Sequence, residues 1–235
     1  MMIKPLLSVV VCLLSVTVVA DTLKVVTGPD YPPYTDPKLP NGGLVTELVS
    51  KTLQRAGWNL ALSWRPWANG YQATLAGEFA ATFPYIRTAE REKVFLFSEP
   101  LFEIKAYVFA LPERNFDGAQ PKTLTGSRYC MPLGWALLPI FARMQKNKEI
   151  TIVSPNDMSS CMKLIALKKV DFTVTDLVQG EEATHQLAAE LPKPIALGGV
   201  VDRQTLHLLM PIHAAGSSER MARFNQALHA QQKTR

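Results

Sequence analysis

Apolar residues recur along this chain with the two spacings that distinguish helices from strands. Between residues 44 and 56 they recur at intervals of three and four, which is typical of one helix face, and Gly57 then ends the helix. Residues 59–64 alternate instead, which predicts a strand. The same patterns predict strands at 23–27, 79–83, 105–111, 128–133, 150–153, 170–175 and 206–211, and helices at 69–76, 90–94, 139–145, 158–167, 180–190 and from 218 onward.

Strands and helices therefore alternate in two successive runs. A polar stretch, 112–126, separates the runs and carries prolines and glycines, so we interpret it as a crossover. Alternating units predict an α/β fold with a parallel sheet and covering helices. We expect one lobe from 21–111, completed by about 213–235, and a second lobe from 112–212. Open α/β lobes bind ligands at the carboxyl ends of their strands, so the default site is a cleft between the lobes.

The first 20 residues resemble a secretory signal peptide. Lys4 supplies an early positive charge, a short apolar run follows, and Ala20 offers a small residue for cleavage. The apolar run is short for a membrane span, which needs about 20 residues. We therefore expect export to the periplasm with cleavage near Ala20; the alternative is an uncleaved anchor.

Charge and cysteine content limit which partners and which cellular compartment we predict for this protein. The formal charge of +5 is dispersed along the chain without a basic block, so nucleic acid is not a predicted partner. Two cysteines remain after the leader, Cys130 and Cys161, and an even pair in an exported protein predicts a disulfide. The alternative is a pair of buried free thiols.

Motifs for catalysis, metal binding and cofactors are lacking. The sequence has no G-x-S-x-G, H-E-x-x-H, phosphate-binding loop or G-x-G-x-x-G pattern, and its four histidines lack metal-like spacing. We predict no metal and no cofactor.

Aromatic and charged residues instead follow the predicted strands. Tyr31 follows the predicted strand 23–27, and Trp67 follows the strand 59–64. Tyr85 and two arginines, Arg87 and Arg91, follow the strand 79–83. In the second run, Trp135 and Asp176 each follow a predicted strand in the same way. Arginine grips a carboxylate through two parallel bonds, aromatic walls hold apolar groups, and an acid holds an ammonium. The alternatives are a solvated charge run for the arginines and core packing for the aromatic rings.

Three segments together resemble the periplasmic solute-binding proteins of polar amino acid ABC importers, family 3 of the bacterial extracellular solute-binding proteins. These segments are YPPY at 31–34, TAEREKVFLFSEPLF at 88–102 and KKVDFTVTD at 168–176. The resemblance implies a two-lobe α/β fold, the type II periplasmic binding protein fold (Venus flytrap), over nearly all of the chain after the leader. It also implies that a closing hinge captures a small ligand.

The resemblance assigns roles residue by residue. Arg91 stands six residues before Phe97 of the F-S-E-P segment, where the family has the arginine that clamps the ligand carboxylate. Asp176 matches the acid that holds the ligand amino group. Tyr31 matches a pocket aromatic, and Trp67 lies near another such position. We expect Tyr85, Trp135 and Arg87 to complete or reshape the pocket.

Two positions depart from the family pattern. Ile86 stands where a serine or threonine usually donates a hydroxyl to the ligand, and Trp135-Ala136 follows Gly134 where hydroxyl residues are common. Each missing hydroxyl bond is worth about 0.5–1.5 kcal/mol when neutral. Backbone N–H groups would have to replace them, and the ligand is expected to differ from the common ones.

These observations predict a periplasmic, monomeric solute-binding protein that captures an amino acid or related zwitterion for an ABC permease. One alternative is an enzyme resembling cyclohexadienyl dehydratase, with Asp176 or Glu99 as the acid. Another is a module that passes its bound state to a membrane sensor. The sequence does not choose between uptake and signalling.

Overall fold

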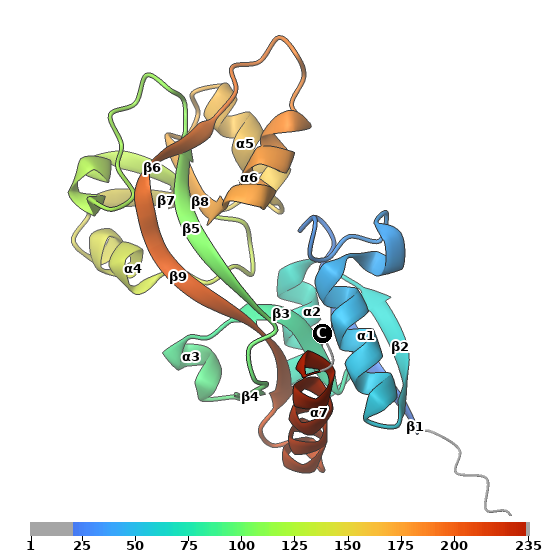
Figure 1. The fold of residues 1–235 in the computed structure, drawn as a ribbon. Helices are drawn as coiled ribbons and strands as arrows, with labels where there is room; N and C mark the ends of the chain where they lie inside the picture. Colours follow the sequence, from blue (N-terminus) through green and yellow to red (C-terminus); the bar gives the residue numbers. More distant parts are fainter. Residues whose placement is uncertain (1–20, 234–235) are drawn as a thin grey trace, which may run out of the picture.

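A computed structural model describes residues 21–233, which form two lobes joined by two long strands (Figure 1). The predicted leader, 1–20, lies outside the described residues. The joining strands are β5 (Phe102–Ala110) and β9 (Ile195–Pro211), which pair antiparallel and run from one lobe into the other. The two lobes therefore share one continuous sheet with the strand order β2-β1-β3-β9-β5-β8-β6-β7.

The first lobe is built on a parallel arrangement at one end of that sheet. β1 (Asp21–Thr27) pairs in parallel with β2 (Trp58–Trp64) and with β3 (Ala81–Ile86). The covering helices are α1 (Leu44–Arg55), α2 (Trp67–Leu75) and α7 (Ser217–Gln232). The shorter elements are the 3-10 turn Pro40–Gly42, α3 (Ala89–Glu92) and β4 (Phe95–Phe97).

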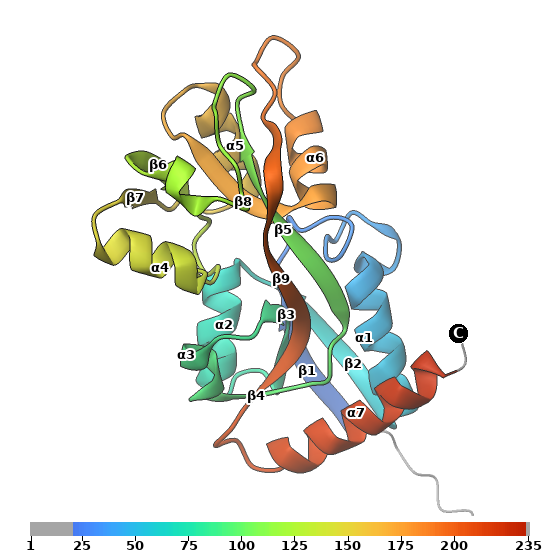
Figure 2. The same ribbon diagram turned by 60° about the vertical axis from the view of Figure 1, so that its left-hand side comes forward.

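The second lobe repeats the pattern at the other end. β6 (Ser127–Cys130) lies between β7 (Ile150–Val153) and β8 (Phe172–Asp176), in parallel with both. The covering helices are α4 (Pro139–Lys146), α5 (Met158–Ala166) and α6 (Leu177–His185), and a 3-10 turn, Pro121–Leu124, precedes β6. Figure 2 shows α4 on one side of this lobe and α6 on the other, with the sheet between them.

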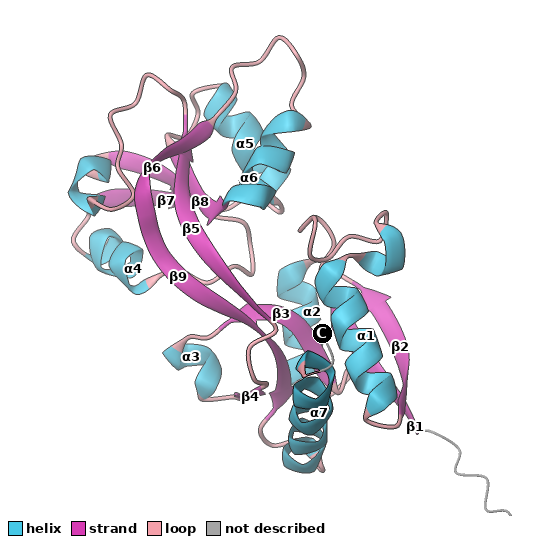
Figure 3. Cartoon of the chain, viewed as in Figure 1, coloured by secondary structure: helices cyan, strands magenta, loops and turns pink. Residues whose placement is uncertain are grey.

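Each lobe has its own hydrophobic core. Phe83, Phe95 and Phe224 are fully enclosed in the core of the first lobe. In the second lobe, Phe141 and Phe172 form one cluster beneath α4, and the buried face of α5 forms another on the opposite side of the sheet. This α/β architecture confirms the predicted type II fold class (Figure 3).

The structure corrects the expected sheet and two of its strands. A purely parallel sheet was predicted, but β9 runs antiparallel to β3, β4 and β5, and β5 runs antiparallel to β8. β9 begins at Ile195 rather than at 206, because its polar, glycine-containing first half pairs with β5 although its composition is typical of a loop. The short strand β4 was not predicted.

The predicted lobe boundaries stay a prediction, and the packing suggests a refinement. Leu206 and Met210 were placed in the second lobe but pack in the first core, and Val108 and Leu111 pack in the second-lobe clusters. We infer that the boundaries lie inside β5 and β9, because the same two strands contribute side chains to both cores.

Two further features bear on compartment. Cys130 and Cys161 form a disulfide that ties β6 to α5, as the sequence predicted. Within residues 21–233, no helix combines the length and the apolar character needed to cross a bilayer.

Candidate ligand-binding site

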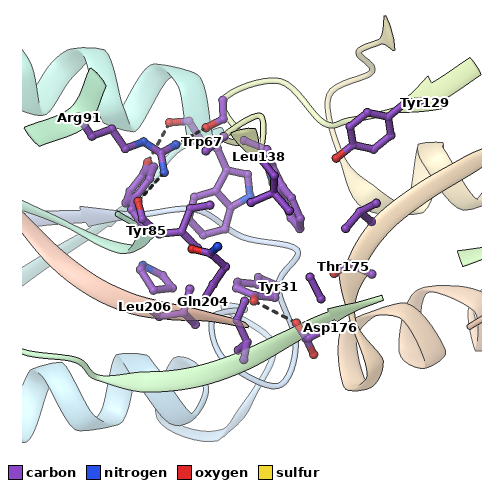
Figure 4. A pocket seen from close by; sticks show the side chains of 18 residues that line it. Tyr31, Trp67, Tyr85, Arg91, Tyr129, Leu138, Thr175, Asp176, Gln204 and Leu206 are labelled. Atoms are coloured by element: carbon purple, nitrogen blue, oxygen red, sulfur yellow. Dashed lines mark hydrogen bonds between the residues drawn. The ribbon is translucent and has the colours of Figure 1, made fainter. Parts of the chain in front are cut away.

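A cavity of about 90 Å³ lies between the lobes (Figure 4). Its walls come from both lobes and from the strands that join them. The lining residues are Tyr31, Trp67, Pro84, Tyr85, Ile86, Arg91, Ile104, Ala106, Tyr129, Gly134, Trp135, Ala136, Leu138, Val174, Thr175, Asp176, Gln204 and Leu206.

Arg91 is held in place by the short helix α3. Thr88 caps this helix, and its hydroxyl accepts a hydrogen bond from the Arg91 backbone N–H at 3.2 Å. The cap fixes the first turn, so the Arg91 side chain leaves the helix toward the cavity (Figure 4).

The Arg91 guanidinium is buried without an ion-pair partner among residues 21–233; the residue is only 8% exposed. Two of its N–H groups donate to backbone carbonyls, Ile86 at 3.0 Å and Gly134 at 3.0 Å. Its Cζ lies 4.8 Å from the ring centre of Tyr85. Burial lowers the pKa of Arg91, and the tyrosine rings of the wall partly offset this. A guanidinium has five N–H donors, so others remain for an anion.

Asp176 faces the cavity from the second lobe, at the junction of β8 and α6. Its carboxylate caps α6 by accepting the Gln179 backbone N–H at 3.1 Å. It also accepts the hydroxyl of Tyr31 at 3.0 Å and that of Tyr34 at 3.4 Å, both from the first lobe. Burial raises the pKa of Asp176, and these donors oppose the rise. A carboxylate has about four acceptor positions, so it can accept one more donor or exchange a tyrosine for it.

The aromatic side chains form a connected wall. The Tyr31 ring lies 5.9 Å from that of Trp135 and 6.3 Å from that of Trp67, while Trp67 lies 5.8 Å from Tyr85. The Tyr85 hydroxyl donates to the Trp67 carbonyl at 3.1 Å. These contacts join four separate segments of the sequence into one wall.

The lobes touch closely beside Arg91. Gly134 has φ +86°, and a Cβ atom there would lie 2.5 Å from the backbone N of Ala68 at the start of α2. Only glycine allows so close an approach in this conformation. The Gly134 carbonyl therefore reaches Arg91 across the interlobe boundary.

The structure brings together six of the seven predicted ligand-binding residues and separates the seventh. Arg87 does not line the cavity: its side chain is 49% exposed, pairs with Glu92 at 2.9 Å and lies over the Phe97 ring. Arg87 therefore fits the alternative given above, in which the arginines belong to a solvent-exposed run of charged residues. Glu99, one candidate acid for the enzyme alternative, is also exposed and outside the cavity.

The backbone at the two departures from the family pattern contacts Arg91. The carbonyls of Ile86 and Gly134 accept hydrogen bonds from its guanidinium. The replacement of the missing hydroxyls by backbone N–H groups stays a prediction. The side chains of Ile86, Trp135 and Ala136 add hydrocarbon to the walls. These positions therefore orient the arginine and make the cavity more apolar.

Sequence analysis missed other residues of the site. Tyr34 was quoted in the YPPY segment without a role, although it shares Asp176 with Tyr31. Gln179 donates its side-chain N–H to the Asp30 carbonyl at 3.2 Å across the lobes. Tyr129 and Gln204 line the cavity from strands β6 and β9. No sequence signal marks Gln179, Tyr129 or Gln204, because they reach the site only through packing.

Asp30 occupies the edge of the site in a strained position. It has φ +64°, its Oδ1 accepts the Trp67 indole N–H at 3.0 Å, and its Oδ2 is buried without a partner. Asp157 and the backbone N–H of Met158 face it from the start of α5, and Asp36 from its own loop. Burial is the main cause that raises the pKa of Asp30 to about 6.

We expect Asp30→Asn to stabilise the protein at pH 7.5 and not at pH 4. A carboxyl whose folded pKa is raised above its unfolded value of 3.8 costs stability as pH rises from about 4 through 6. The cost of its ionised form is up to about 3 kcal/mol, at 1.36 kcal/mol per pKa unit. Asparagine keeps the acceptor for Trp67 and removes the charge. Thermal unfolding from pH 4 to 8 measures the gain, with Glu99→Gln as an exposed control that removes the same charge. A gain that does not depend on pH would contradict the assigned pKa.

Comparisons place the chain among known proteins. A model of the bacterial extracellular solute-binding proteins, family 3, matches residues 23–234. No curated protein is similar enough in sequence to match.

Many solved structures resemble the fold, and three of them serve as examples. The first is a histidine kinase sensor domain with similarity to periplasmic binding proteins (TM-score 0.77, 20% identity, 92% of this chain and 92% of that chain). The second is holo ArgBP from T. maritima (TM-score 0.73, 18% identity, 90% and 90%). The third is the amino acid ABC transporter substrate-binding protein AbpA from Streptococcus pneumoniae, bound to L-arginine (TM-score 0.72, 18% identity, 91% and 90%).

Proposed function

Because the chain belongs to family 3 of the bacterial extracellular solute-binding proteins, we propose that it captures a zwitterion, an amino acid or a close relative, between its lobes. The observation that carries this proposal is the buried guanidinium of Arg91 in the wall of the interlobe cavity, which has no ion-pair partner among residues 21–233. A buried cation costs several kcal/mol unless an anion compensates it. A ligand carboxylate is the partner that the planar fork of Arg91 fits best.

The second anchor is Asp176, on the opposite lobe. A ligand ammonium would add to its acceptor set or displace the Tyr31 hydroxyl. Each lobe thus contributes one charged group to the same ligand, so the ligand would stabilise the closed arrangement through contacts that the open one lacks. This is the physical basis for capture by closure.

The proposal is one of binding without turnover. Asp176 is the remaining candidate acid of the enzyme alternative, and both its oxygens are engaged by donors of the protein.

The recipient of the ligand is an ABC permease or, in the alternative, a membrane sensor, and the protein acts as a monomer in the periplasm. Uptake of a radiolabelled ligand is compared between cells with and without the gene. If the recipient is a permease, uptake requires this protein; if the recipient is a sensor, uptake does not depend on it.

Titration of purified protein with the proteinogenic L-amino acids is expected to reveal at least one ligand that raises the melting temperature. The protein is first unfolded and refolded to remove any bound molecule. For each binder, the amide of its carboxylate and the deaminated acid serve as matched controls. Removing either charge is expected to weaken binding at least tenfold, as measured by calorimetry, and the bound ligand should be recovered unchanged by mass spectrometry.

If no amino acid binds, or if the amide binds as tightly as its parent, the proposed role of the Arg91–Asp176 pair is wrong.

A further inference from the structure

The walls of the interlobe cavity carry two charged side chains, Arg91 and Asp176, and otherwise little polarity. Most of the other lining side chains are hydrocarbon or aromatic. They include Ile86, Ile104, Leu138, Val174 and Leu206, and the indole rings of Trp67 and Trp135. Once a ligand's carboxylate and ammonium occupy the two anchors, no charged lining group is left for a charged side chain. Such a side chain would lose its hydration without compensation.

Polar groups of the wall are mostly engaged by the protein itself. The Thr175 hydroxyl donates to the side-chain oxygen of Gln179, and the Gln204 amide donates to Asp202 at 2.6 Å. Tyr129 is the exception. The residue is 2% exposed, and burial alone raises its pKa, with no hydrogen bond from residues 21–233 contributing.

Tyr129 is fixed by the core of the second lobe. Its ring stacks on Phe172 with centres 4.9 Å apart and 2° between the planes, and it lies 5.0 Å from the ring of Phe141. Figure 4 shows its hydroxyl pointing toward the cavity from the side opposite Arg91, above Thr175 and Asp176 in this view. Burial raises the pKa of Tyr129, so the hydroxyl is neutral at physiological pH.

We propose that the ligand is an α-amino acid with an uncharged side chain, apolar along its length, whose tip forms a hydrogen bond with the Tyr129 hydroxyl. This rests on the proposed function, since Arg91 and Asp176 hold the α-carboxylate and α-amine. Tyr129 is then a specificity-determining residue. A site that offers a buried hydroxyl rejects an analogue that leaves it unpaired more strongly than a purely apolar wall would.

Calorimetry on the wild-type chain with matched ligand pairs tests the charge requirement. Glutamine is compared with glutamate, and citrulline with arginine, because each pair differs in side-chain charge at nearly constant shape. The tightest binder of the proteinogenic panel is expected to be neutral, and the neutral member of a pair to bind at least tenfold more tightly. A tightest ligand with a charged side chain overturns the inference while leaving the proposed function intact; absence of any amino acid binding overturns both.

Tyr129→Phe tests the hydroxyl itself. The variant keeps the ring stacked on Phe172, so the fold is expected to persist, as near-ultraviolet circular dichroism checks. The preference for a polar-tipped ligand over its less polar counterpart, tyrosine over phenylalanine or glutamine over methionine, is expected to fall at least fivefold. Tyr107→Phe is the matched control, since Tyr107 belongs to the second lobe and does not line the cavity. An unchanged preference in Tyr129→Phe overturns the role of the hydroxyl.

Discussion

Replacing Arg91 with methionine is expected to weaken amino acid binding by about 100-fold or more. Removing one partner of a buried, hydrogen-bonded charge pair costs about 2–5 kcal/mol, and 100-fold corresponds to about 3 kcal/mol. Methionine replaces the stem of the side chain with a similar apolar volume but offers no N–H group to a carboxylate. The loss should therefore appear as a faster dissociation rate, measured by stopped-flow fluorescence of the tryptophans beside the cavity.

The same substitution should change the stability of the ligand-free protein little. It removes the bonds from Arg91 to the carbonyls of Ile86 and Gly134, which is unfavourable. It also relieves the desolvation of a buried cation without an ion-pair partner among residues 21–233, which is favourable. A variant that melts near the wild-type temperature yet fails to bind would separate the role of Arg91 in binding from any role in folding.

Arg87→Met is the matched control. Arg87 lies four residues earlier, is half exposed and pairs with Glu92 at the surface, where such pairs contribute about 0–1 kcal/mol. Its replacement should leave affinity within about twofold of wild type. Equal losses in the two variants would mean that the net positive charge of this region attracts the ligand and that no specific clamp exists.

Local patterns predicted the fold class because each helix and most strands bury one face. The apolar repeat of α1 and the alternation of β2 are such cases, and both elements lie close to the predicted bounds. The first half of β9 could not be predicted in this way. Its segment from Ile195 to Gln204 is half exposed, contains two glycines, and is extended because β5 pairs with it. Long-range pairing of this kind leaves no local signal.

The residues of the candidate site likewise divide into those that local sequence patterns predicted and those that they did not. Arg91 and Asp176 could be inferred from motif spacing, and Tyr31 and Trp67 from their position after strands. Tyr129 could not, because it lies within a strand and its sequence neighbours are typical of a core. Arg87 shows the converse limit: it shares a charged segment with Arg91, but only Arg91 occupies the turn of α3 that Thr88 directs toward the cavity.

Replacing both Cys130 and Cys161 with alanine is expected to lower the free energy of unfolding by about 3–4 kcal/mol. The disulfide closes a loop with a sequence separation of 31 residues, and the chain-entropy model gives this magnitude for such a loop. Native stability is typically about 5–15 kcal/mol, so the loss is a large fraction of it. Chemical denaturation of the oxidised wild type and the double variant measures the difference.

Reduction of the wild type separates the cross-link from the packing of the two sulfur atoms. Both cysteines are fully buried in the cluster beneath α5, so alanine also removes apolar contacts there. Wild type unfolded and refolded with a reductant keeps the sulfur atoms and loses only the bond. The reduced wild type should recover most of the packing but not the cross-link. Its free energy of unfolding is therefore expected between those of the oxidised wild type and the double variant, and nearer to that of the double variant. A reduced wild type as stable as the oxidised form would show that the cross-link contributes nothing.

The disulfide variant should affect binding far less than Arg91→Met. The bond joins α5 to β6, and β6 carries Tyr129 of the cavity wall, so its loss loosens that wall without removing a charged anchor. Affinity is expected to fall less than tenfold at temperatures where the variant stays folded. The two substitutions would then have opposite effects: one removes affinity and leaves stability, the other removes stability and leaves most of the affinity. A loss of binding in the disulfide variant as large as that in Arg91→Met would mean that capture depends on the rigidity of the second lobe more than on the charged pair.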